Sequence, residues 1–253
     1  MFTTDIVINK LNEFKNSDLP DKQINNRIYS AKELAGYIDH TLLKADATNK
    51  ELIQLCNESR KAGFASVCIN PCNVELCSKE LFGSSVKVCT VIGFPLGANE
   101  TSIKVDETEL ALKSGAQEID MVINIGRIKD REQNYIMTEI RAIAELCHAN
   151  NALLKVIIET ALLSDEEKVL TCLLSLDSNA DYVKTSTGFS KSGANIYDVA
   201  LMKFIVGDKL KVKASGGVRS YDDAVLMIQN GASRLGTSSG LKIIENSHSD
   251  SEY

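Results

Sequence analysis

The stretch DYVKTSTG at residues 181–188 places Lys184 at the end of a short apolar strand, and KVKASGGV at residues 211–218 repeats the arrangement with Lys213. A buried strand end holds an ammonium ion poorly, because burial removes water from the charge and a second ammonium repels it. At about 6 Å and an effective dielectric of about 20, two such charges repel by ~2–3 kcal/mol, which favours the neutral form of one amine. A neutral amine is a nucleophile that attacks carbonyl carbons. The two stretches therefore predict a reactive lysine beside a second lysine.

Length and composition predict one globular domain. The chain has 253 residues, of which 44% are hydrophobic and 25% charged, and it has three prolines, as is typical of an α/β barrel. A net charge of −6 without a basic run argues against nucleic-acid binding. Apolar stretches are too short to cross a bilayer, and the first ten residues lack the basic start and apolar run of a signal peptide. We therefore expect a cytoplasmic protein with neither nucleic-acid nor membrane partners.

The cysteines and histidines predict no metal site. Seven cysteines are scattered through the expected strands and helices, which fits a reducing compartment. Cys68, Cys72 and Cys77 form a cluster, but its spacing is not that of a zinc site and no histidine lies nearby. The three histidines, at positions 40, 148 and 248, lack the i, i+4 spacing of a helical site. We expect neither a metal nor another cofactor.

Short β-rich runs alternate with longer amphipathic segments along the chain. Near-continuous Val/Ile/Leu runs, typical of parallel strands buried on both faces, predict strands at residues 37–39, 66–70, 86–92, 118–123, 153–158, 182–184, 210–214 and 234–236. Apolar residues at helical spacing predict helices at residues 49–62, 72–81, 102–114, 131–149, 165–175, 196–205, 221–230 and 238–246. Eight strand–helix units of this kind predict a closed (β/α)8 TIM barrel of the α/β class.

The whole chain, residues 1–253, is expected to form a single domain with three parts. Residues 1–32 form a short N-terminal helical extension, expected to cover the barrel floor and assigned no chemistry. Residues 33–246 form the barrel. Residues 247–253 form a flexible polar tail.

Four charged side chains fall where a barrel carries its chemistry, toward the C-terminal ends of the strands. Lys184 ends the sixth predicted strand, Lys213 lies near the end of the seventh, Asp120 lies on the fourth, and Asp39 ends the first. An isolated strand lysine often extends to solvent instead, and an aspartate can merely cap a loop. Asp120, however, lies between apolar neighbours and must face inward, where a carboxylate needs a cationic partner. The lysine pair supplies that partner.

The loops after the seventh and eighth strands predict a phosphate site. They read SGGV at residues 215–218 and GTSSG at residues 236–240. Glycines let backbone N–H groups approach an anion, hydroxyls add donors, and a helix begins after each loop. Turns and helix caps use the same residues, so each loop alone is a weak signal. Their position in the barrel favours phosphate.

Six stretches in order resemble the deoxyribose-phosphate aldolases: IDHTLLK at 38–44, VIGFPLG at 91–97, EIDMVIN at 118–124, VKTSTGF at 183–189, KASGGVR at 213–219 and GTSS at 236–239. The resemblance covers nearly the whole barrel. It implies a class I aldolase that reversibly cleaves 2-deoxy-D-ribose 5-phosphate to acetaldehyde and D-glyceraldehyde 3-phosphate through a lysine Schiff base, without metal. The implied partners are this sugar phosphate and these aldehydes, and the implied pathway role is catabolism of deoxyribonucleosides. A homodimer or another homo-oligomer is compatible with the sequence.

The resemblance also implies a role for individual residues. Lys184 matches the lysine that forms the imine. Lys213 matches the second lysine, which keeps the first in its amine form and joins in proton transfer. Asp120 matches the aspartate that shuttles a proton through water, and Asp39 resembles an aspartate that hydrogen-bonds within that network. The positions that match the family's phosphate site are Gly188, Gly216, Gly217, Ser238 and Ser239.

Some alternatives remain open at this stage. Tyr253 ends the polar tail, and some relatives use a terminal tyrosine as a proton carrier whereas others have none, so this tyrosine is either a further catalytic residue or part of a disordered end. The enzyme could instead be another lysine-imine aldolase or a transaldolase acting on a different sugar phosphate. It could also be a sugar-phosphate isomerase or binding barrel in which Lys184 acts only through its charge.

Overall fold

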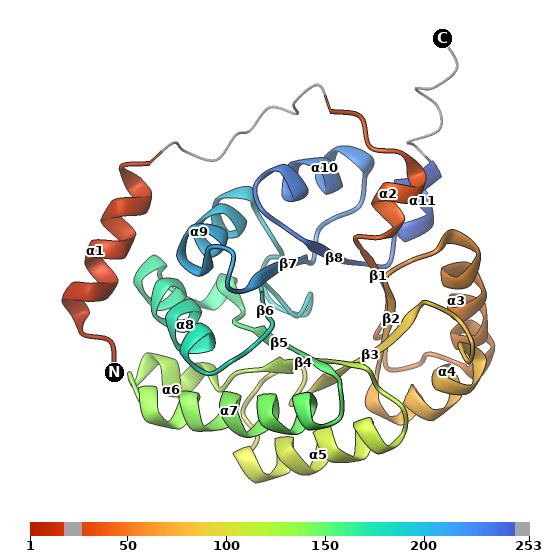
Figure 1. Cartoon of the computed structure of the whole chain (residues 1–253), viewed down its shortest axis with the longest axis horizontal. Helices are drawn as coiled ribbons and strands as arrows, with labels where there is room; N and C mark the ends of the chain where they lie inside the picture. The colour runs from red at the N-terminus through yellow and green to blue at the C-terminus, as the bar shows by residue number, and fades with distance from the viewer. Residues whose placement is uncertain (18–26, 246–253) are drawn as a thin grey trace.

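Eight parallel strands form a closed barrel in the computed structural model, which describes residues 1–17 and 27–245 (Figure 1). Each strand is hydrogen-bonded to the next along the chain, and the last pairs with the first. The strands are β1 (Ile38–Leu42), β2 (Ser66–Ile69), β3 (Lys87–Ile92), β4 (Glu118–Val122), β5 (Leu153–Ile157), β6 (Tyr182–Lys184), β7 (Lys211–Ser215) and β8 (Arg234–Thr237). The predicted TIM barrel is confirmed.

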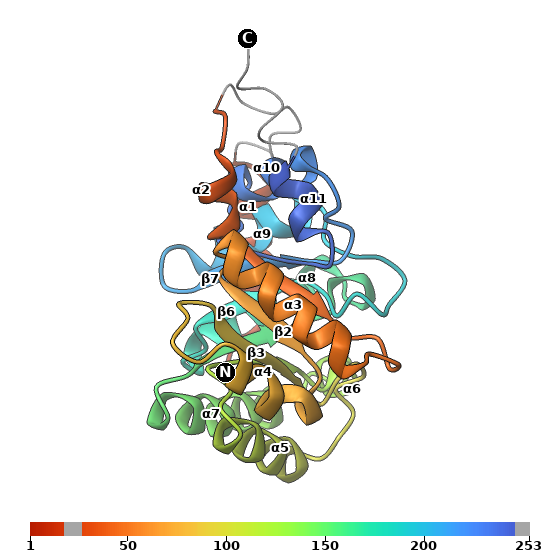
Figure 2. The same cartoon turned by 90° about the vertical axis from the view of Figure 1, so that its right-hand side faces the viewer.

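Helices surround the barrel as an outer ring (Figures 1 and 2). Those expected from the sequence are present as α3 (Asn49–Ala62), α4 (Val74–Glu80), α5 (Thr101–Lys113), α7 (Gln133–Ala149), α8 (Asp165–Asp177), α9 (Ile196–Val206), α10 (Tyr221–Gln229) and α11 (Gly240–Glu245). A short helix that was not predicted, α6 (Ile125–Lys129), follows β4. Side-chain caps set several helix starts: Thr48 and Ser164 each form a capping box with a glutamate three residues later.

Most of the hydrophobic core lies between the strands and the helices, and the barrel interior differs from it. Cys68, Cys89 and Val91 form a small separate apolar cluster, whereas many other buried strand residues are charged. Because side chains alternate along a strand, the inward positions of β4 include both Glu118 and Asp120. Charged groups thus take the place of some of the branched apolar side chains that usually fill a barrel.

The N-terminal extension contains α1 (Thr4–Lys15) and α2 (Ala31–Ala35), and the prediction that it covers the barrel floor is wrong for α1. This helix lies against the outer ring, beside α8 and α9 (Figure 1). It packs there through a buried apolar stripe that includes Phe14, whose ring centroid lies 5.4 Å from that of Tyr197 and 5.5 Å from that of Phe204. Aromatic residues of α9 therefore contribute to the packing of α1 on the outer ring.

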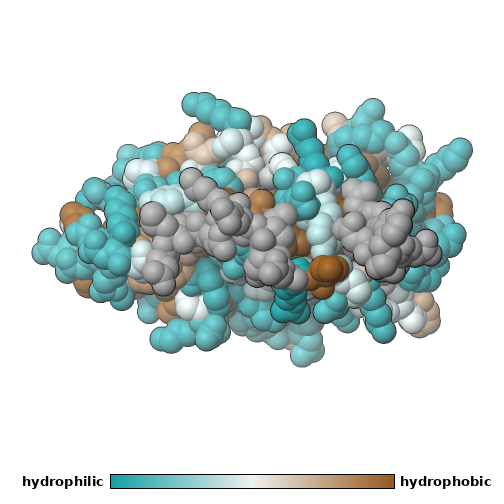
Figure 3. All heavy atoms as spheres, turned by 90° about the horizontal axis from the view of Figure 1, so that it is seen from above, coloured by the Kyte–Doolittle hydropathy of each residue, from teal (hydrophilic) through white to brown (hydrophobic). Residues whose placement is uncertain are grey.

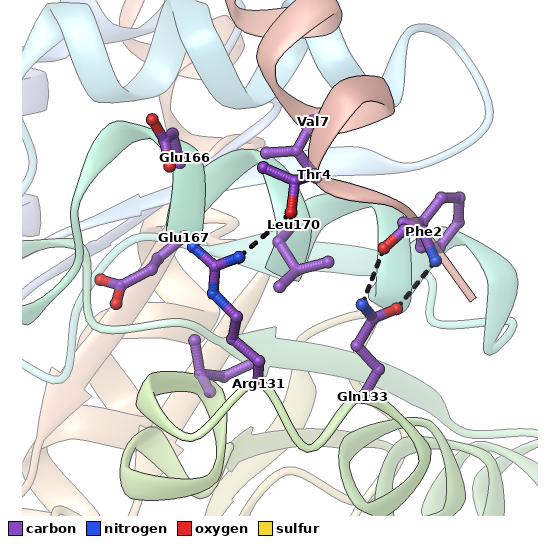
Figure 4. Close-up of a pocket in the computed structure, with 9 residues that line it drawn as sticks. Phe2, Thr4, Val7, Arg131, Gln133, Glu166, Glu167 and Leu170 are labelled. Atoms are coloured by element: carbon purple, nitrogen blue, oxygen red, sulfur yellow. Dashed lines mark hydrogen bonds between the residues drawn. The ribbon is translucent and has the colours of Figure 1, made fainter.

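Hydrogen bonds also fix the start of the chain (Figure 4). The main chain of Phe2 exchanges two hydrogen bonds of 2.8 Å with the side-chain amide of Gln133. Nη1 of Arg131 donates to Oγ1 of Thr4 at 3.2 Å. The cavity that these residues line has a volume of only about 40 Å³, so it has little room for a ligand.

The molecular surface shown in Figure 3 is mostly hydrophilic, with hydrophobic residues scattered over it. Among the described residues, no helix combines the length and apolar character that crossing a bilayer requires. The predicted polar tail, residues 247–253, lies outside the described residues.

Candidate active site

A buried ion cluster inside the barrel brings the four predicted charged residues together. Oδ2 of Asp120 accepts hydrogen bonds from Lys184 Nζ at 2.6 Å and from Lys213 Nζ at 2.7 Å. Lys213 also forms an ion pair with Asp39. Asp39, Asp120 and Lys213 are completely buried, whereas Lys184 keeps 3% of its surface exposed. Of these four side chains, Lys184 is therefore the one in contact with solvent.

Three more charged side chains complete the cluster, and sequence reasoning missed all of them. Lys155 Nζ lies 2.8 Å from Oδ1 of Asp120 and 2.7 Å from Oε2 of Glu118. Arg234 Nη1 lies 2.6 Å from Oδ1 of Asp39 and 3.1 Å from Oε2 of Glu118. The signal was present for Lys155, because it interrupts the apolar strand LLKVI at residues 153–157.

Strand register explains why these side chains meet. Lys184 is the register partner of Lys213, Asp120 is that of Lys155, and Lys213 is that of Arg234. Neighbouring strands lie about 4.8 Å apart and paired residues project from the same face of the sheet. The four strands β4 to β7, with β8, therefore direct their charges toward one point inside the barrel.

The ion pairs keep the cluster charged. Burial alone would raise the pKa of Asp120, but Lys155, Lys184 and Lys213 outweigh it and hold that pKa well below its ordinary value. Burial alone would lower the pKa of Lys213, but the carboxylates of Asp120 and Asp39 raise it above the ordinary lysine value. These pKa shifts favour the ammonium form of Lys213 and the carboxylate form of Asp120 in the free protein.

Two features differ from the sequence prediction. Asp39 does not end β1, which continues to Leu42; the predicted strand was too short because His40 and Thr41 interrupt its apolar pattern. Lys184 and Lys213 are also not an isolated pair, because Asp120 accepts a hydrogen bond from each of them. The repulsion estimated for an isolated lysine pair therefore omits a shared carboxylate.

Two thiols border the cluster. Cys89 Sγ lies 3.1 Å from Oδ1 of Asp120 and 3.3 Å from Lys155 Nζ, and burial raises the pKa of Cys89 well above its ordinary value. Cys68, Cys89 and Asp120 each offer a metal-ligand atom within 4.8 Å of the others. The protons of Lys155 and of the Cys89 thiol already satisfy Oδ1 of Asp120, so we assign no metal there.

A cavity of about 490 Å³ opens above Lys184. Its lining includes all five positions predicted to bind phosphate, which are Gly188, Gly216, Gly217, Ser238 and Ser239. The cavity is large enough for a sugar phosphate. It also reaches two cationic side chains, Lys44 and Arg219, which were not predicted as site residues.

Backbone N–H groups around this cavity are free to bind an anion. Gly188, Gly216 and Gly217 have φ angles of 88°, 79° and 84°, a conformation that glycine adopts without strain. No hydrogen bond between described residues uses the N–H groups of these three glycines or of Ser238. The N–H of Ser239, in contrast, donates to Thr237 Oγ1 at 2.9 Å, which leaves Ser239 its hydroxyl. Tyr253, the remaining predicted site residue, lies outside the described residues.

Comparison with known proteins assigns the family. The model of the DeoC/LacD aldolase family matches residues 34–246. The chain belongs to the DeoC/LacD aldolase family. This aldolase, a lyase, is 54% identical over 222 residues to a deoxyribose-phosphate aldolase of Clostridium perfringens, covering 88% of this chain and 99% of the relative. It is 52% identical over 214 residues to one of Caldicellulosiruptor saccharolyticus, covering 84% of this chain and 97% of that relative.

Solved structures agree with this assignment. A tetrameric deoxyribose phosphate aldolase from Aeropyrum pernix has a TM-score of 0.81 and 32% identity to this aldolase, over 98% of this chain and 99% of that one. An aldolase named QR15 has the same TM-score and 40% identity, over 85% of this chain and 95% of that one. The first of these matches extends over nearly the whole chain.

Proposed function

We propose that this aldolase reversibly cleaves 2-deoxy-D-ribose 5-phosphate to acetaldehyde and D-glyceraldehyde 3-phosphate through a Schiff base on Lys184. The observation that carries the proposal is the position of Lys184 between the buried ion cluster and the open cavity. Nζ of Lys184 lies 2.6 Å from Oδ2 of Asp120. The side chain of Lys184 also lines the cavity, together with the loops predicted to bind phosphate. The names of the relatives support this substrate.

The charge balance of the cluster supports Lys184 as the nucleophile. The three buried carboxylates are Asp39, Glu118 and Asp120, and three other cations, Lys155, Lys213 and Arg234, pair with them. Lys184 is then a fourth cation that shares Asp120 with two other lysines. Each buried carboxylate therefore keeps a cationic partner when Lys184 acts as an amine, and an amine is the form that attacks a carbonyl.

The proposed reaction begins at the amine of Lys184. The amine of Lys184 attacks C1 of the open-chain sugar, and loss of water gives a protonated imine. Removal of the C3 hydroxyl proton breaks the C2–C3 bond, releases D-glyceraldehyde 3-phosphate and leaves an enamine of acetaldehyde on Lys184. Protonation at C2 and hydrolysis then release acetaldehyde and regenerate the amine. Asp120 and Lys213, acting through water, are the proton carriers in this proposal, and Asp39 holds Lys213 in place.

The loops after β6, β7 and β8 are proposed to bind the phosphate. Four free backbone N–H groups and the hydroxyls of Ser238 and Ser239 provide donors for phosphate oxygens. Phosphate held at this end of the cavity would present the other end of the sugar to Lys184. Binding energy of the phosphate can then orient the carbonyl for attack.

An assay of products tests this proposal against its alternatives. Purified protein, treated with a chelator, is incubated with 2-deoxy-D-ribose 5-phosphate, and acetaldehyde and D-glyceraldehyde 3-phosphate are measured separately. Equal amounts of both aldehydes are expected. In the reverse direction, acetaldehyde should serve as donor and ketone donors should not, whereas a transaldolase would prefer the ketones. Isomerised sugar phosphate without acetaldehyde would overturn the proposal.

A further inference from the structure

Glu159 follows β5 directly and has a backbone conformation that is unusual for its residue type. Its φ and ψ angles are 54° and 67°, in the left-handed region that a residue with a Cβ enters only with strain. Only 2% of the surface of Glu159 is exposed. A strained and buried carboxylate beside an active site suggests a specific task.

The backbone on each side of Glu159 fixes it against β6. The N–H of Ile158 donates to the carbonyl of Lys184 at 3.0 Å, and the N–H of Thr160 donates to that of Thr185 at 2.9 Å. These two bonds hold Glu159 between them. The side chain of Glu159 therefore reaches the residues that follow Lys184.

The contact that Glu159 makes is with Thr187. Oε2 of Glu159 accepts a hydrogen bond from the hydroxyl of Thr187 at 2.5 Å and another from its N–H at 3.2 Å. Oγ1 of Thr187 in turn accepts from the N–H of Phe189 at 3.1 Å. Glu159 is thus linked to both sides of Gly188, whose own N–H faces no partner among the described residues.

The far end of the same loop is attached separately. The N–H of Ala194 bonds to the carbonyls of Ser215 and Gly216 at 3.0 and 2.9 Å. A Cβ on Gly193 would lie only 2.2 Å from the carbonyl oxygen of Gly216, so the loop after β6 packs closely on the end of β7. The loop is held at Ala194 by β7 and at Thr187 by Glu159.

We infer that Glu159 is a positioning residue that holds Thr187 and Gly188 in place to bind the phosphate of the substrate. This inference rests on the proposed function. Glu159 does not line the cavity, so it acts through Thr187, which does. Its other oxygen, Oε1, is buried without a hydrogen-bond partner among the described residues. A buried carboxylate oxygen without a partner lowers the stability of the fold. The contact of Glu159 with Thr187 offsets this loss by holding the loop after β6 in one conformation.

The variant Glu159→Gly removes the carboxylate without adding backbone strain. Glycine adopts the left-handed conformation freely, so this variant should fold and lose only the link to Thr187. We expect KM for 2-deoxy-D-ribose 5-phosphate to rise about tenfold with a much smaller change in kcat. Glu159→Gln, which keeps an acceptor oxygen of the same reach, should restore most of the loss.

The matched control is Asn151→Gly. Asn151 lies just before the start of β5 and has a φ of 55°, but it is exposed and does not line the cavity. This variant makes the same backbone change and should leave KM unchanged. Thr187→Val removes the hydroxyl from the opposite side of the link, and it should raise KM as Glu159→Gly does.

A binding measurement keeps this test independent of the reaction. Inorganic phosphate should raise the unfolding temperature of the wild type, and Glu159→Gly should weaken phosphate about tenfold while Asn151→Gly should not. Wild-type phosphate affinity and KM in Glu159→Gly or in Thr187→Val would overturn the inference and leave the proposed function intact. Failure of the wild type to cleave the sugar phosphate would instead overturn the proposed function, and the phosphate measurement would still decide the role of Glu159.

Discussion

Lys184 Nζ and Asp120 Oδ2 lie 2.6 Å apart inside the barrel. The same carboxylate also binds Lys213 and Lys155, at 2.7 and 2.8 Å. Asp120 therefore keeps two cationic partners when Lys184 gives up its proton. A nucleophilic amine at Lys184 leaves no buried carboxylate unpaired, which is the electrostatic basis of the proposed chemistry.

Lys213→Leu should reduce kcat/KM at neutral pH by at least about a hundredfold. Without this ammonium, the three buried carboxylates Asp39, Glu118 and Asp120 keep only Lys155 and Arg234 besides Lys184, so the ammonium form of Lys184 is needed to balance them. Raising the pH should recover part of the loss but not all of it, because Lys213 is also proposed to carry protons. The rate of imine formation, measured against pH, checks this prediction.

The control is Lys211→Leu. Lys211 lies on the same strand but is exposed, so its replacement should leave the pH profile of imine formation unchanged. A Lys213→Leu profile identical to that of the wild type would mean that burial alone activates Lys184.

Ser239→Asp should raise KM for 2-deoxy-D-ribose 5-phosphate at least tenfold, because it places a carboxylate beside the proposed phosphate site. Activity on unphosphorylated deoxyribose should fall far less. Steady-state kinetics on both substrates measure the difference. Ser85→Asp adds the same charge at the opposite end of the barrel, before β3, and should change neither. Equal losses on both substrates in Ser239→Asp would place the phosphate elsewhere.

Much of the barrel was predictable because parallel strands buried on both faces are near-continuous apolar runs. The glycines and serines of the loops after β7 and β8 follow the ends of two such strands, so the sequence could place these loops beside the cavity, while their binding of phosphate stays a proposal. Lys184 was chosen as a candidate because of the polar residues that follow it, and Asp120 because of its apolar neighbours. Each of these signals is local in sequence.

The rest of the site depends on register and backbone geometry, which short sequence windows do not contain. Lys155 and Arg234 could each have faced outward, and only the pairing of Lys155 with Asp120 and of Arg234 with Lys213 shows that they meet. The left-handed conformation of Glu159 is equally invisible, because it is imposed by contacts between β5 and β6.

The ion pair between Lys104 and Glu139 should be critical for stability. Both side chains are completely buried, Nζ lies 2.8 Å from Oε1, and Nζ also donates to the carbonyl of Val122 on β4. Lys104→Met should cost about 3–5 kcal/mol in unfolding free energy, because it leaves the Glu139 carboxylate buried without a cation. Urea-induced unfolding measures this loss.

Two further variants serve as controls for Lys104→Met. The double variant Lys104→Met/Glu139→Leu removes both charges and should lose much less stability than Lys104→Met alone. Lys79→Ala breaks an exposed ion pair with Glu75 and should change the unfolding free energy far less than Lys104→Met does, because water screens the exposed pair. Equal losses in the single and double variants would show that packing of the Lys104 side chain, rather than charge pairing, is what stabilises this region.

The low pKa of Asp39 predicts that the protein loses stability in acid. Burial would raise its pKa, but Lys213, Arg234 and Lys155 outweigh burial and hold the pKa below the ordinary value. A carboxylate of this kind stabilises the fold fully above its unfolded pKa of about 4, and the stabilisation is lost as pH falls through the folded pKa. The unfolding free energy contributed by Asp39 should therefore be constant from pH 7 to about 5 and decline below about 4.

Asp39→Asn removes this titration. The variant should be less stable than the wild type at pH 7 and should show a shallower decline below pH ~4. Urea unfolding at a series of pH values compares the two slopes. Parallel slopes would indicate that other carboxylates account for the acid sensitivity.

The most direct test of the central claim is to trap the covalent intermediate. Borohydride added with 2-deoxy-D-ribose 5-phosphate reduces an imine to a stable amine, and peptide mass analysis locates the added mass. The proposed mechanism predicts one modification, on Lys184, and none in Lys184→Arg, whose guanidinium cannot form the imine. A substrate-dependent adduct on Lys155 or Lys213, or no adduct in an enzyme that turns over, would contradict it.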